Sequence, residues 1–160
     1  MANFDWSKRD ALKAFAAVAS APVLGLPAHA APIPPLEPDQ IEALIEQKFG
    51  SIEPKPGPVT LKIPALSESG NSVPLTVIVD SASENAVDHV LVVATRNRRP
   101  MVMDVQFANG IPKAQISTRI RLNETQTLLA FAKLHTGEVW KAQTNVEVVI
   151  GACEGLGFTY

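Results

Sequence analysis

Residues 116–122 read Ile-Ser-Thr-Arg-Ile-Arg-Leu, and apolar and polar side chains alternate along them. Successive side chains of a β-strand point to opposite faces of the sheet. One face of this segment therefore carries Ile116, Ile120 and Leu122, and the other carries Ser117, Arg119 and Arg121. This alternation predicts a half-buried strand of an antiparallel sheet, with its apolar face in a core.

Further strand-like segments occupy most of the chain from residue 59 to residue 150. The turn signals between them are Ser69-Gly70-Asn71, Arg98-Arg99-Pro100, Asn109-Gly110 and His135-Thr136-Gly137. The segments themselves are residues 59–63, 73–79, 89–94, 101–107, 113–122, 127–134 and 139–150. Regularly spaced short strands with tight turns predict an all-β, immunoglobulin-like antiparallel β-sandwich.

One helix is expected before the strands. Pro38 is suited to the first turn of a helix, and Gly50 to the position just past its end. The apolar side chains between them, at helical spacing, are Ile41, Leu44, Ile45 and Phe49. We expect this short helix to pack across one side of the sheet, and the Pro/Gly-rich residues 53–58 to form a linker.

The first 30 residues are typical of an export signal. Ser7-Lys8-Arg9-Asp10-Ala11-Leu12-Lys13 is similar to a twin-arginine pattern, with Lys8 in the first twin position. The apolar stretch 14–26 that follows is too short to remain as a membrane-spanning helix. Ala28-His29-Ala30 then offers a cleavage site, so we expect a mature chain that starts near Ala31 in a bacterial periplasm.

These features divide the chain into four parts. They are the signal at 1–30, the helix and linker at 31–58, the β-sandwich at 59–150 and a flexible arm at 151–160. The whole chain has 14 basic and 16 acidic side chains, and loss of residues 1–30 changes its net charge from −2 to −3. This weak negative charge argues against nucleic acid or, after processing, an anionic membrane as a partner.

Cys153 is the only cysteine of the chain and lies in Gly151-Ala152-Cys153-Glu154-Gly155, just past the last expected strand. Glycine loosens the backbone, so we expect Gly151, Ala152, Glu154 and Gly155 to form a flexible arm around the thiol. An extended chain from Ile150 to Cys153 reaches roughly 10 Å. A stray terminal cysteine can be neutral, but an unpaired exposed thiol in an oxidising compartment favours a chemical role.

Other candidate chemistry is sparse. A soft-metal site built from Cys153 with Met101, Met103, His89 or His135 would suit copper. These residues lack a recognisable ligand spacing, and we expect both methionines on the inward face of a strand and His135 in a turn. The sequence contains no Gly-x-Ser-x-Gly motif of the kind that would indicate a hydrolase.

Arg96, Arg98 and Arg99 form a basic cluster between two expected strands. Such clusters are most often solvated loops. The alternative for this cluster is a role in binding an acidic partner or an anionic substrate.

Several separated segments resemble the SoxY family, the sulfur-carrier subunits of the periplasmic thiosulfate-oxidising Sox system. They are residues 73–81, Arg99-Pro100, residues 116–122, Gly137-Glu138-Val139-Trp140-Lys141-Ala142 and residues 146–155. The likeness extends from the signal to the terminal cysteine, so it covers essentially the whole chain. It implies an immunoglobulin-like fold and a heterodimer with a small β-protein similar to SoxZ.

The resemblance also implies a covalent carrier cysteine on a swinging arm, which falls on Cys153. In the family, a haem enzyme (SoxXA-like) conjugates thiosulfate to this sulfur and a hydrolase (SoxB-like) releases sulfate. In some systems a molybdenum enzyme (SoxCD-like) oxidises the remaining sulfane. The carrier itself is not an enzyme and needs no cofactor beyond the sulfur that it holds.

The arm departs from the family pattern Gly-Gly-Cys-Gly-Gly. Ala152 and Glu154 flank the cysteine here, and Leu156-Gly157-Phe158-Thr159-Tyr160 continue beyond the arm. Three functions follow as hypotheses: a sulfur carrier, an adaptor subunit that no longer carries sulfur, and a soft-metal chaperone.

Overall fold

The computed structural model describes residues 32–81 and 85–152, and within them the chain forms one helix and nine strands. The helix is α1 (Pro38–Phe49). The strands are β1 (Lys55–Pro56), β2 (Val59–Lys62), β3 (Leu66–Ser69), β4 (Val73–Asp80), β5 (Val87–Ala94), β6 (Met101–Ile111), β7 (Lys113–Ile120), β8 (Gln126–Leu134) and β9 (Val139–Ile150). The helix and all the strands predicted from the sequence are confirmed, with small shifts of their ends.

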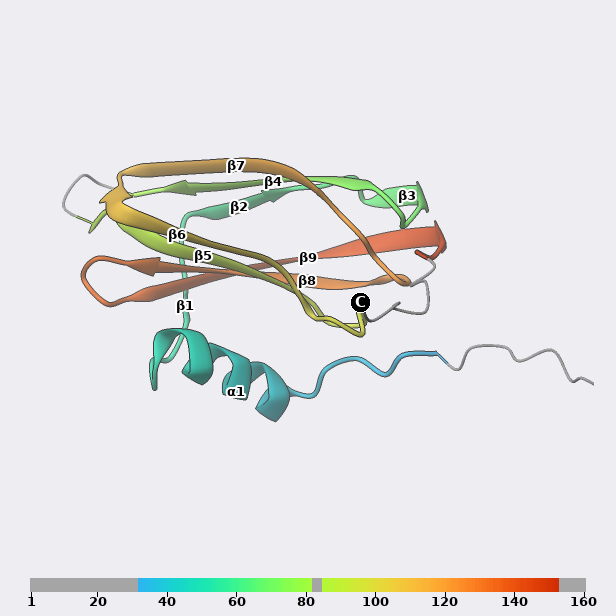
Figure 1. Cartoon of the computed structure of the whole chain (residues 1–160), viewed down its shortest axis with the longest axis horizontal. Helices are drawn as coiled ribbons and strands as arrows, with labels where there is room; N and C mark the ends of the chain where they lie inside the picture. Colours follow the sequence, from blue (N-terminus) through green and yellow to red (C-terminus); the bar gives the residue numbers. More distant parts are fainter. Residues whose placement is uncertain (1–31, 82–84, 153–160) are drawn as a thin grey trace, which may run out of the picture. The chain divides into compact units, whose positions relative to one another are not determined.

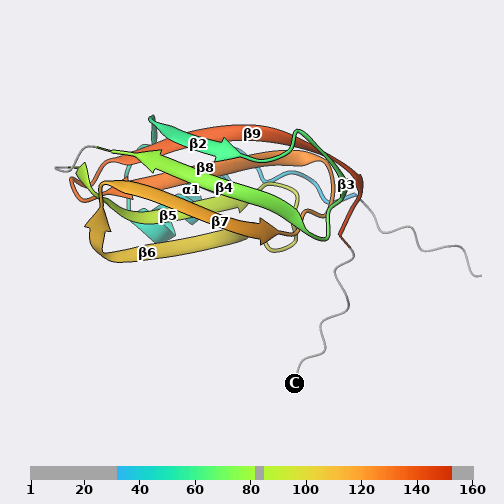
Figure 2. The same ribbon diagram turned by 90° about the horizontal axis from the view of Figure 1, so that it is seen from above.

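The described strands form two sheets that face each other (Figures 1 and 2). The larger has the order β1-β9-β8-β5-β6, with β3 also paired to β9, and the smaller has the order β2-β4-β7. This arrangement confirms the predicted sandwich. It differs in one respect, because β1 and β3 pair with β9 in parallel, whereas the other pairs are antiparallel.

The core between the sheets follows from strand alternation. On β4, Val73, Leu75, Val77 and Val79 are buried, and the residues between them are exposed or half-buried. The apolar side chains of successive odd positions therefore point at the larger sheet, as the period of two requires. The outward side chains of β4 meet solvent.

Strand β5 is buried on both faces because it lies between two apolar layers. Val90 and Val92 belong to the core between the sheets, and Leu91 and Val93 belong to a second cluster beneath α1. A continuous apolar run of this kind is typical of a strand covered on both sides.

Helix α1 covers the outer face of the larger sheet (Figure 1). At its start, the side chain of Gln40 accepts a hydrogen bond of 2.9 Å from the backbone N–H of Glu37, which satisfies a donor that the helix leaves unpaired. Ile45 and Phe49 are buried against the sheet residues Leu91 and Phe131. The predicted packing of the helix on one side of the sheet is thus confirmed.

Two local expectations differ from the structure. Asn109-Gly110 does not separate two strands, since β6 continues to Ile111, and Gly110 has a φ of 60° within it. The pairing of β5 with β6 shifts register between Val87 and His89, which is the sign of a bulge. A second shift lies at Val92/Val93, opposite Met101, and Met101 is 41% exposed rather than turned inward.

The expected linker at 53–58 contains β1, which is hydrogen-bonded to β9. In the part of the chain that the structure describes, no helix has the length and apolar character needed to cross a membrane.

Candidate functional site at the base of the C-terminal arm

Cys153, Glu154 and Gly155 lie outside the described residues, which end at Ala152. The candidate site is therefore described up to the residue that precedes the cysteine. Gly151 and Ala152 follow directly on β9, and their contacts define the base from which the arm leaves the sandwich.

Three chain segments meet at this base in a continuous series of backbone hydrogen bonds. The N–H of Gly70 donates to the carbonyl of Ile150 at 2.7 Å, and the N–H of Leu122 donates to the carbonyl of Gly70 at 2.8 Å. The N–H of Ala152 then donates to the carbonyl of Leu122 at 2.9 Å. We refer to residues 70, 122, 123 and 150–152 as the arm clamp.

The clamp is packed so closely that two of its positions admit only glycine. A Cβ on Gly151 would lie 1.8 Å from the carbonyl oxygen of Asn123, and one on Gly70 would lie 1.9 Å from that of Leu122. Ala152 is only 9% exposed. Gly151 and Ala152, expected from the sequence in the flexible arm, are thus held within the folded domain because both their backbones are in contact with residues 122 and 123.

A buried polar network fixes the other side of residues 121–123. The side chain of Asn97 donates to the carbonyl of Arg121 at 2.8 Å and accepts from the N–H of Asn123 at 3.0 Å. It also accepts from the side chain of Gln126 at 2.8 Å, whose oxygen accepts from the N–H of Arg96 at 2.7 Å. Asn97 and Gln126 are 7% and 5% exposed, so the loop between β5 and β6 is rigidly joined to the clamp.

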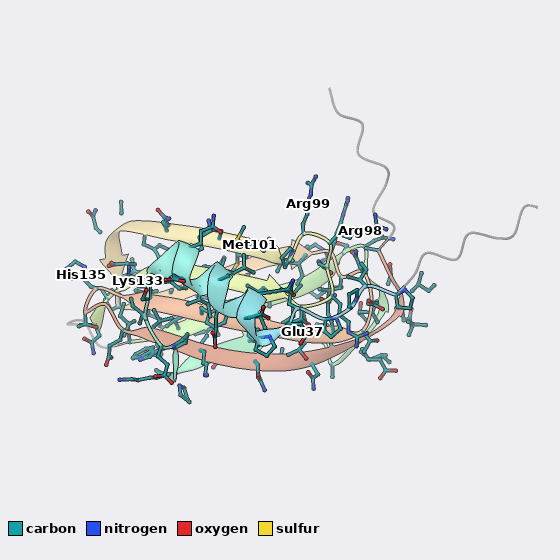
Figure 3. The ribbon with its side chains drawn as sticks, turned by 90° about the horizontal axis from the view of Figure 1, so that it is seen from below. Glu37, Arg98, Arg99, Met101, Lys133 and His135 are labelled. Carbon is teal, nitrogen blue, oxygen red and sulfur yellow. The ribbon has the colours of Figure 1, made fainter. Side chains whose placement is uncertain are left out.

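This loop carries the arginine cluster found in the sequence. Arg96 lies 3.9 Å from the carboxylate of Glu124, whereas Arg98 and Arg99 are exposed and project away from the ribbon (Figure 3). Arg121, also exposed, lies in the segment that Asn97 holds. The arm base is therefore bordered by a surface rich in guanidinium groups.

His89, a candidate metal ligand, is a buried structural residue. It is 5% exposed, its ring meets that of Phe49 edge-on at a centroid distance of 4.9 Å, and its Nε2 bonds Asp104. Lys48 of α1 donates a hydrogen bond to the same carboxylate. The hydrogen bond from Lys48 is the larger cause, and that with His89 the smaller, of a lowered pKa at Asp104. This cluster fastens α1 to β5 and β6.

The other candidate ligands that the structure describes are His135, Met101 and Met103. His135 lies in a turn, as expected, and pairs with Asp88 at 3.2 Å. Met103 is buried, but Met101 is exposed on the surface (Figure 3). Among the described residues, no group of three or more His, Cys, Asp or Glu side chains is arranged to hold a metal ion.

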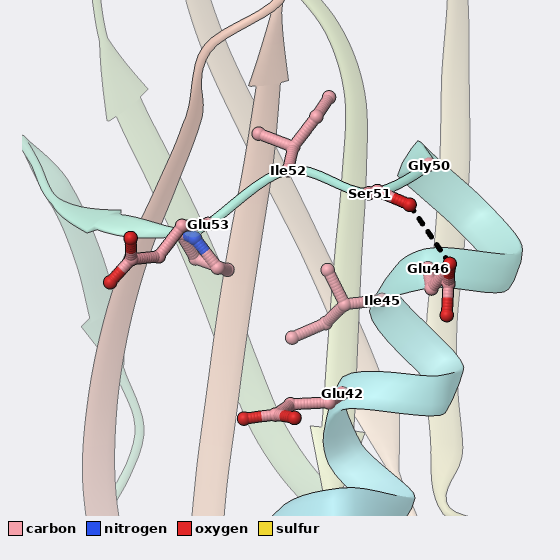
Figure 4. Close-up of a pocket in the computed structure, with 8 residues that line it drawn as sticks. Glu42, Ile45, Glu46, Gly50, Ser51, Ile52 and Glu53 are labelled. Atoms are coloured by element: carbon pink, nitrogen blue, oxygen red, sulfur yellow. Dashed lines mark hydrogen bonds between the residues drawn. The ribbon is translucent and has the colours of Figure 1, made fainter.

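A shallow hollow at the end of α1 is also a poor site for an anionic sulfur compound. Its volume is about 330 Å³, and Figure 4 shows Glu42, Glu46 and Glu53 around it. Ser51 is its only hydroxyl side chain, and that hydroxyl donates to Glu46 at 2.9 Å. Three carboxylates would repel an anion.

The sequence matches one known protein family over most of its length. Residues 45–153 match the family described as sulfur oxidation protein SoxY, and the match ends at Cys153 itself. The chain belongs to the SoxY family. The resemblance inferred from separated segments is thereby confirmed, and the shared region includes α1 from Ile45 on, the described strands and the arm clamp.

The fold is also that of a SoxY protein. The sulfur carrier protein SoxY from Chlorobium limicola f thiosulfatophilum is similar with a TM-score of 0.62 and 24% identity, over 71% of this chain and 100% of that one. Weaker likenesses include a superoxide reductase (neelaredoxin) from Ignicoccus hospitalis, with a TM-score of 0.45 and 15% identity over 69% of this chain and 91% of that one. No curated protein sequence matches this SoxY chain.

The sequence pattern does not identify the residues that build the clamp or hold its neighbours. It places Gly70 in a turn and Arg121 on an outward strand face, but the backbone contacts of both residues depend on pairing between segments that are distant in the sequence. Asn97 and Gln126 are polar residues next to strand ends, which is the one signal that could have marked them as buried and bonded.

Proposed function

We propose that this SoxY protein is a periplasmic sulfur carrier that holds thiosulfate-derived sulfur covalently on Cys153 and presents it to separate enzymes. The observation that carries this proposal is the family match, which extends to the chain's only cysteine. The related protein from Chlorobium is described as a sulfur carrier. A thiolate is the form of cysteine that reacts in such transfers.

The chemistry of loading requires an oxidising partner. Joining the thiol to thiosulfate through a new S–S bond releases one proton and two electrons, and a SoxXA-like haem enzyme would accept those electrons. A SoxB-like hydrolase would then add water, release sulfate with two protons and leave a persulfide anion on Cys153. A SoxCD-like enzyme would oxidise that sulfane sulfur, so the carrier itself supplies only the attachment point.

The arm clamp supports this role because it fixes where the carrier segment leaves the domain. Ala152 is the residue before the cysteine, and its backbone is bonded to Leu122. Cargo attached one residue later is therefore presented from a defined place on the sandwich. An enzyme that accepts it can recognise the surface around the clamp as well as the arm.

Two further parts of the proposal rest on the family and on the sequence. Residues 1–30 would act as an export signal, so the carrier would work in the periplasm. A small β-protein similar to SoxZ would form a heterodimer with it. Leu66, Val149 and Ile150 are exposed by 54%, 65% and 65%, and exposed apolar side chains of this kind support a protein partner.

An adaptor subunit is the second candidate, favoured by the altered arm. Ala152 and Glu154 stand where the family arm has glycine, and residues 156–160 continue beyond the arm. The added side chains make entry into a narrow active site harder.

Intact-mass spectrometry of the mature protein from thiosulfate-grown cells separates these candidates. A sulfur or thiosulfate adduct on Cys153 supports the carrier. An unmodified thiol in actively oxidising cells would support the adaptor, and bound copper would support a metal chaperone.

A further inference from the structure

An exposed patch lies at the end of the larger sheet, on the face that points away from the smaller sheet. Val146 and Val148 of β9 belong to the core between the sheets, so Glu147 and Val149 point the opposite way. Both of these outward residues are exposed. Helix α1 packs on the same outer face, against other residues, and leaves this end of β9 open.

Strand β3 completes the patch, because it is paired in parallel with the end of β9 (Figure 1). Leu66 is paired with Glu147, and the same register, continued to the end of both strands, puts Glu68 opposite Val149. Residues that lie opposite each other share one face of a sheet. The outer face therefore carries two apolar side chains and two carboxylates, each apolar side chain beside a carboxylate. We refer to Leu66, Glu68, Glu147 and Val149 as the β3/β9 patch.

The apolar side chains of this region are highly exposed. Leu66 is 54% exposed, and Val149 and its neighbour Ile150 are each 65% exposed. Among the described residues, the one other large apolar side chain that is exposed is Met101, on β6 at the opposite edge of the larger sheet. The concentration of three such side chains at one place indicates a surface that another protein covers.

A hollow of about 550 Å³ borders the patch on the same face of the sheet. Thr127 and Asn145 line it, and Arg96 and Glu124 face each other at 3.9 Å on its wall. Asn145 comes two residues before Glu147 on β9, so the hollow adjoins the patch. A side chain that a partner inserts into the hollow would be anchored beside the patch, as the strongest contacts of protein interfaces commonly are.

The charge of the patch indicates the kind of partner. Glu68 and Glu147 are exposed, and neither takes part in the ion pairs between described residues. A second copy of this chain, bound by two-fold symmetry, would bring these carboxylates against their own counterparts, which is repulsive. Lysine and arginine match the patch, because their apolar stems can cover Leu66 or Val149 while their charged ends meet the carboxylates.

We propose that the β3/β9 patch is the docking surface for a partner protein that presents basic side chains, and that this partner is the small β-protein of the proposed heterodimer. The inference rests on that part of the proposed function. Val149 immediately precedes the clamp residues 150–152 in the chain. The bound partner therefore flanks the base of the arm.

The apolar half of the surface is tested with a separately purified SoxZ-like protein and the full-length mature Cys153→Ser chain, by isothermal titration calorimetry. In this background, Leu66→Ser and Val149→Ser together should raise the Kd at least about ten-fold, because both apolar contacts are lost. Met101→Ser is the matched control, since it removes an exposed apolar side chain from the opposite edge of the sheet. Its Kd should be unchanged, and thermal unfolding of each free variant checks that the fold is intact.

The carboxylates are tested by a measurement that a purely structural role would not affect. Glu68→Gln and Glu147→Gln should each slow association with the SoxZ-like protein about three-fold at low salt, and the difference should vanish at 1 M salt. Glu138→Gln is the matched control, because Glu138 is exposed at the other end of β9, with its backbone roughly 30 Å from that of Glu147. Its association rate should equal that of the unaltered chain.

The outcomes separate this surface from the heterodimer itself. An unchanged Kd in the double serine variant, or equal weakening by Met101→Ser, would overturn the docking surface and leave the heterodimer standing. A SoxZ-like protein that does not bind the unaltered chain would refute the heterodimer, and the docking proposal with it.

Discussion

The backbone N–H of Ala152 donates a 2.9 Å hydrogen bond to the carbonyl of Leu122, which ties the residue before Cys153 to the segment that follows β7. Because Leu122 is in turn bonded to Gly70, and Gly70 to Ile150, the arm base is fixed on three chain segments. Under the proposed carrier function, the sulfur attachment point follows directly on this defined position in the chain. Enzymes that act on the cargo would then approach this end of the fold.

Gly151→Ala should destabilise the domain. Its Cβ would lie 1.8 Å from the carbonyl oxygen of Asn123, and this backbone contact can be relieved only by a shift of the clamp. We expect a loss of about 1–3 kcal/mol in the free energy of unfolding, measured by urea denaturation. Gly137→Ala is the comparison, since its site has a φ of 89° but open space, so strain in the backbone alone should cost about 1–2 kcal/mol. A smaller loss at Gly151 than at Gly137 would show that the clamp is not tightly packed.

Asp104→Asn should make the protein less stable at neutral pH but not in acid. The hydrogen bonds from Lys48 and His89 lower the folded-state pKa of Asp104, so its carboxylate stabilises the fold above its ordinary pKa of 3.8. That contribution is lost as the pH falls through the lowered value. The difference in unfolding free energy between the two proteins should therefore shrink toward zero once the pH lies below the lowered pKa of Asp104. Asp80→Asn, in an exposed pair with Lys113, should show little difference at any pH, and an Asp104 effect that persists in acid would contradict this account.

Glu154→Gly should speed the alkylation of Cys153 by iodoacetamide at pH 7. A carboxylate next to the thiol disfavours the thiolate, so its removal lowers the thiol pKa. The gain should be modest, up to about five-fold, and larger at low than at high salt because dissolved ions screen the repulsion between charges in solvent. Rates that stay the same, or fall, at both ionic strengths would exclude Glu154 as a regulator of the thiol.

A small β-rich protein should accompany this chain in its native compartment. Affinity-tagged Cys153→Ser protein, recovered from that compartment and analysed by size-exclusion chromatography with mass spectrometry, should elute as a heterodimer. The serine background excludes a disulfide-linked homodimer. Recovery of a strict monomer with no such companion would contradict the proposed association.

Much of the sandwich could be predicted because its strands carry their period in the sequence. The alternation of β4 and the run 116–122 identify their buried faces without any structure. Strands β1 and β3 could not be found, since two and four residues paired in parallel leave no periodic signal. Asn109-Gly110 is a strong hairpin signal, but the pairing of β6 with β5 carries the strand past it.

The candidate site was predicted only in part for a similar reason. Cys153 was identified from its isolation and position, and the family match extends to it. The hydrogen bonds that join Asn97, Leu122 and Ala152 connect segments far apart in sequence, so they depend on tertiary structure. The glycines near the cysteine predict a flexible backbone, whereas at Gly151 the absence of a side chain permits close packing against Asn123.

The most direct test of the carrier account is peptide-level mass spectrometry of this protein from cells that oxidise isotopically labelled thiosulfate. Wild-type chain and the Cys153→Ser variant would be produced side by side, with circular dichroism to show that both are folded. The account predicts labelled sulfur on the peptide that contains Cys153, in the wild-type chain alone. Labelled sulfur retained covalently by the serine variant, or none on wild-type protein in actively oxidising cells, would contradict it.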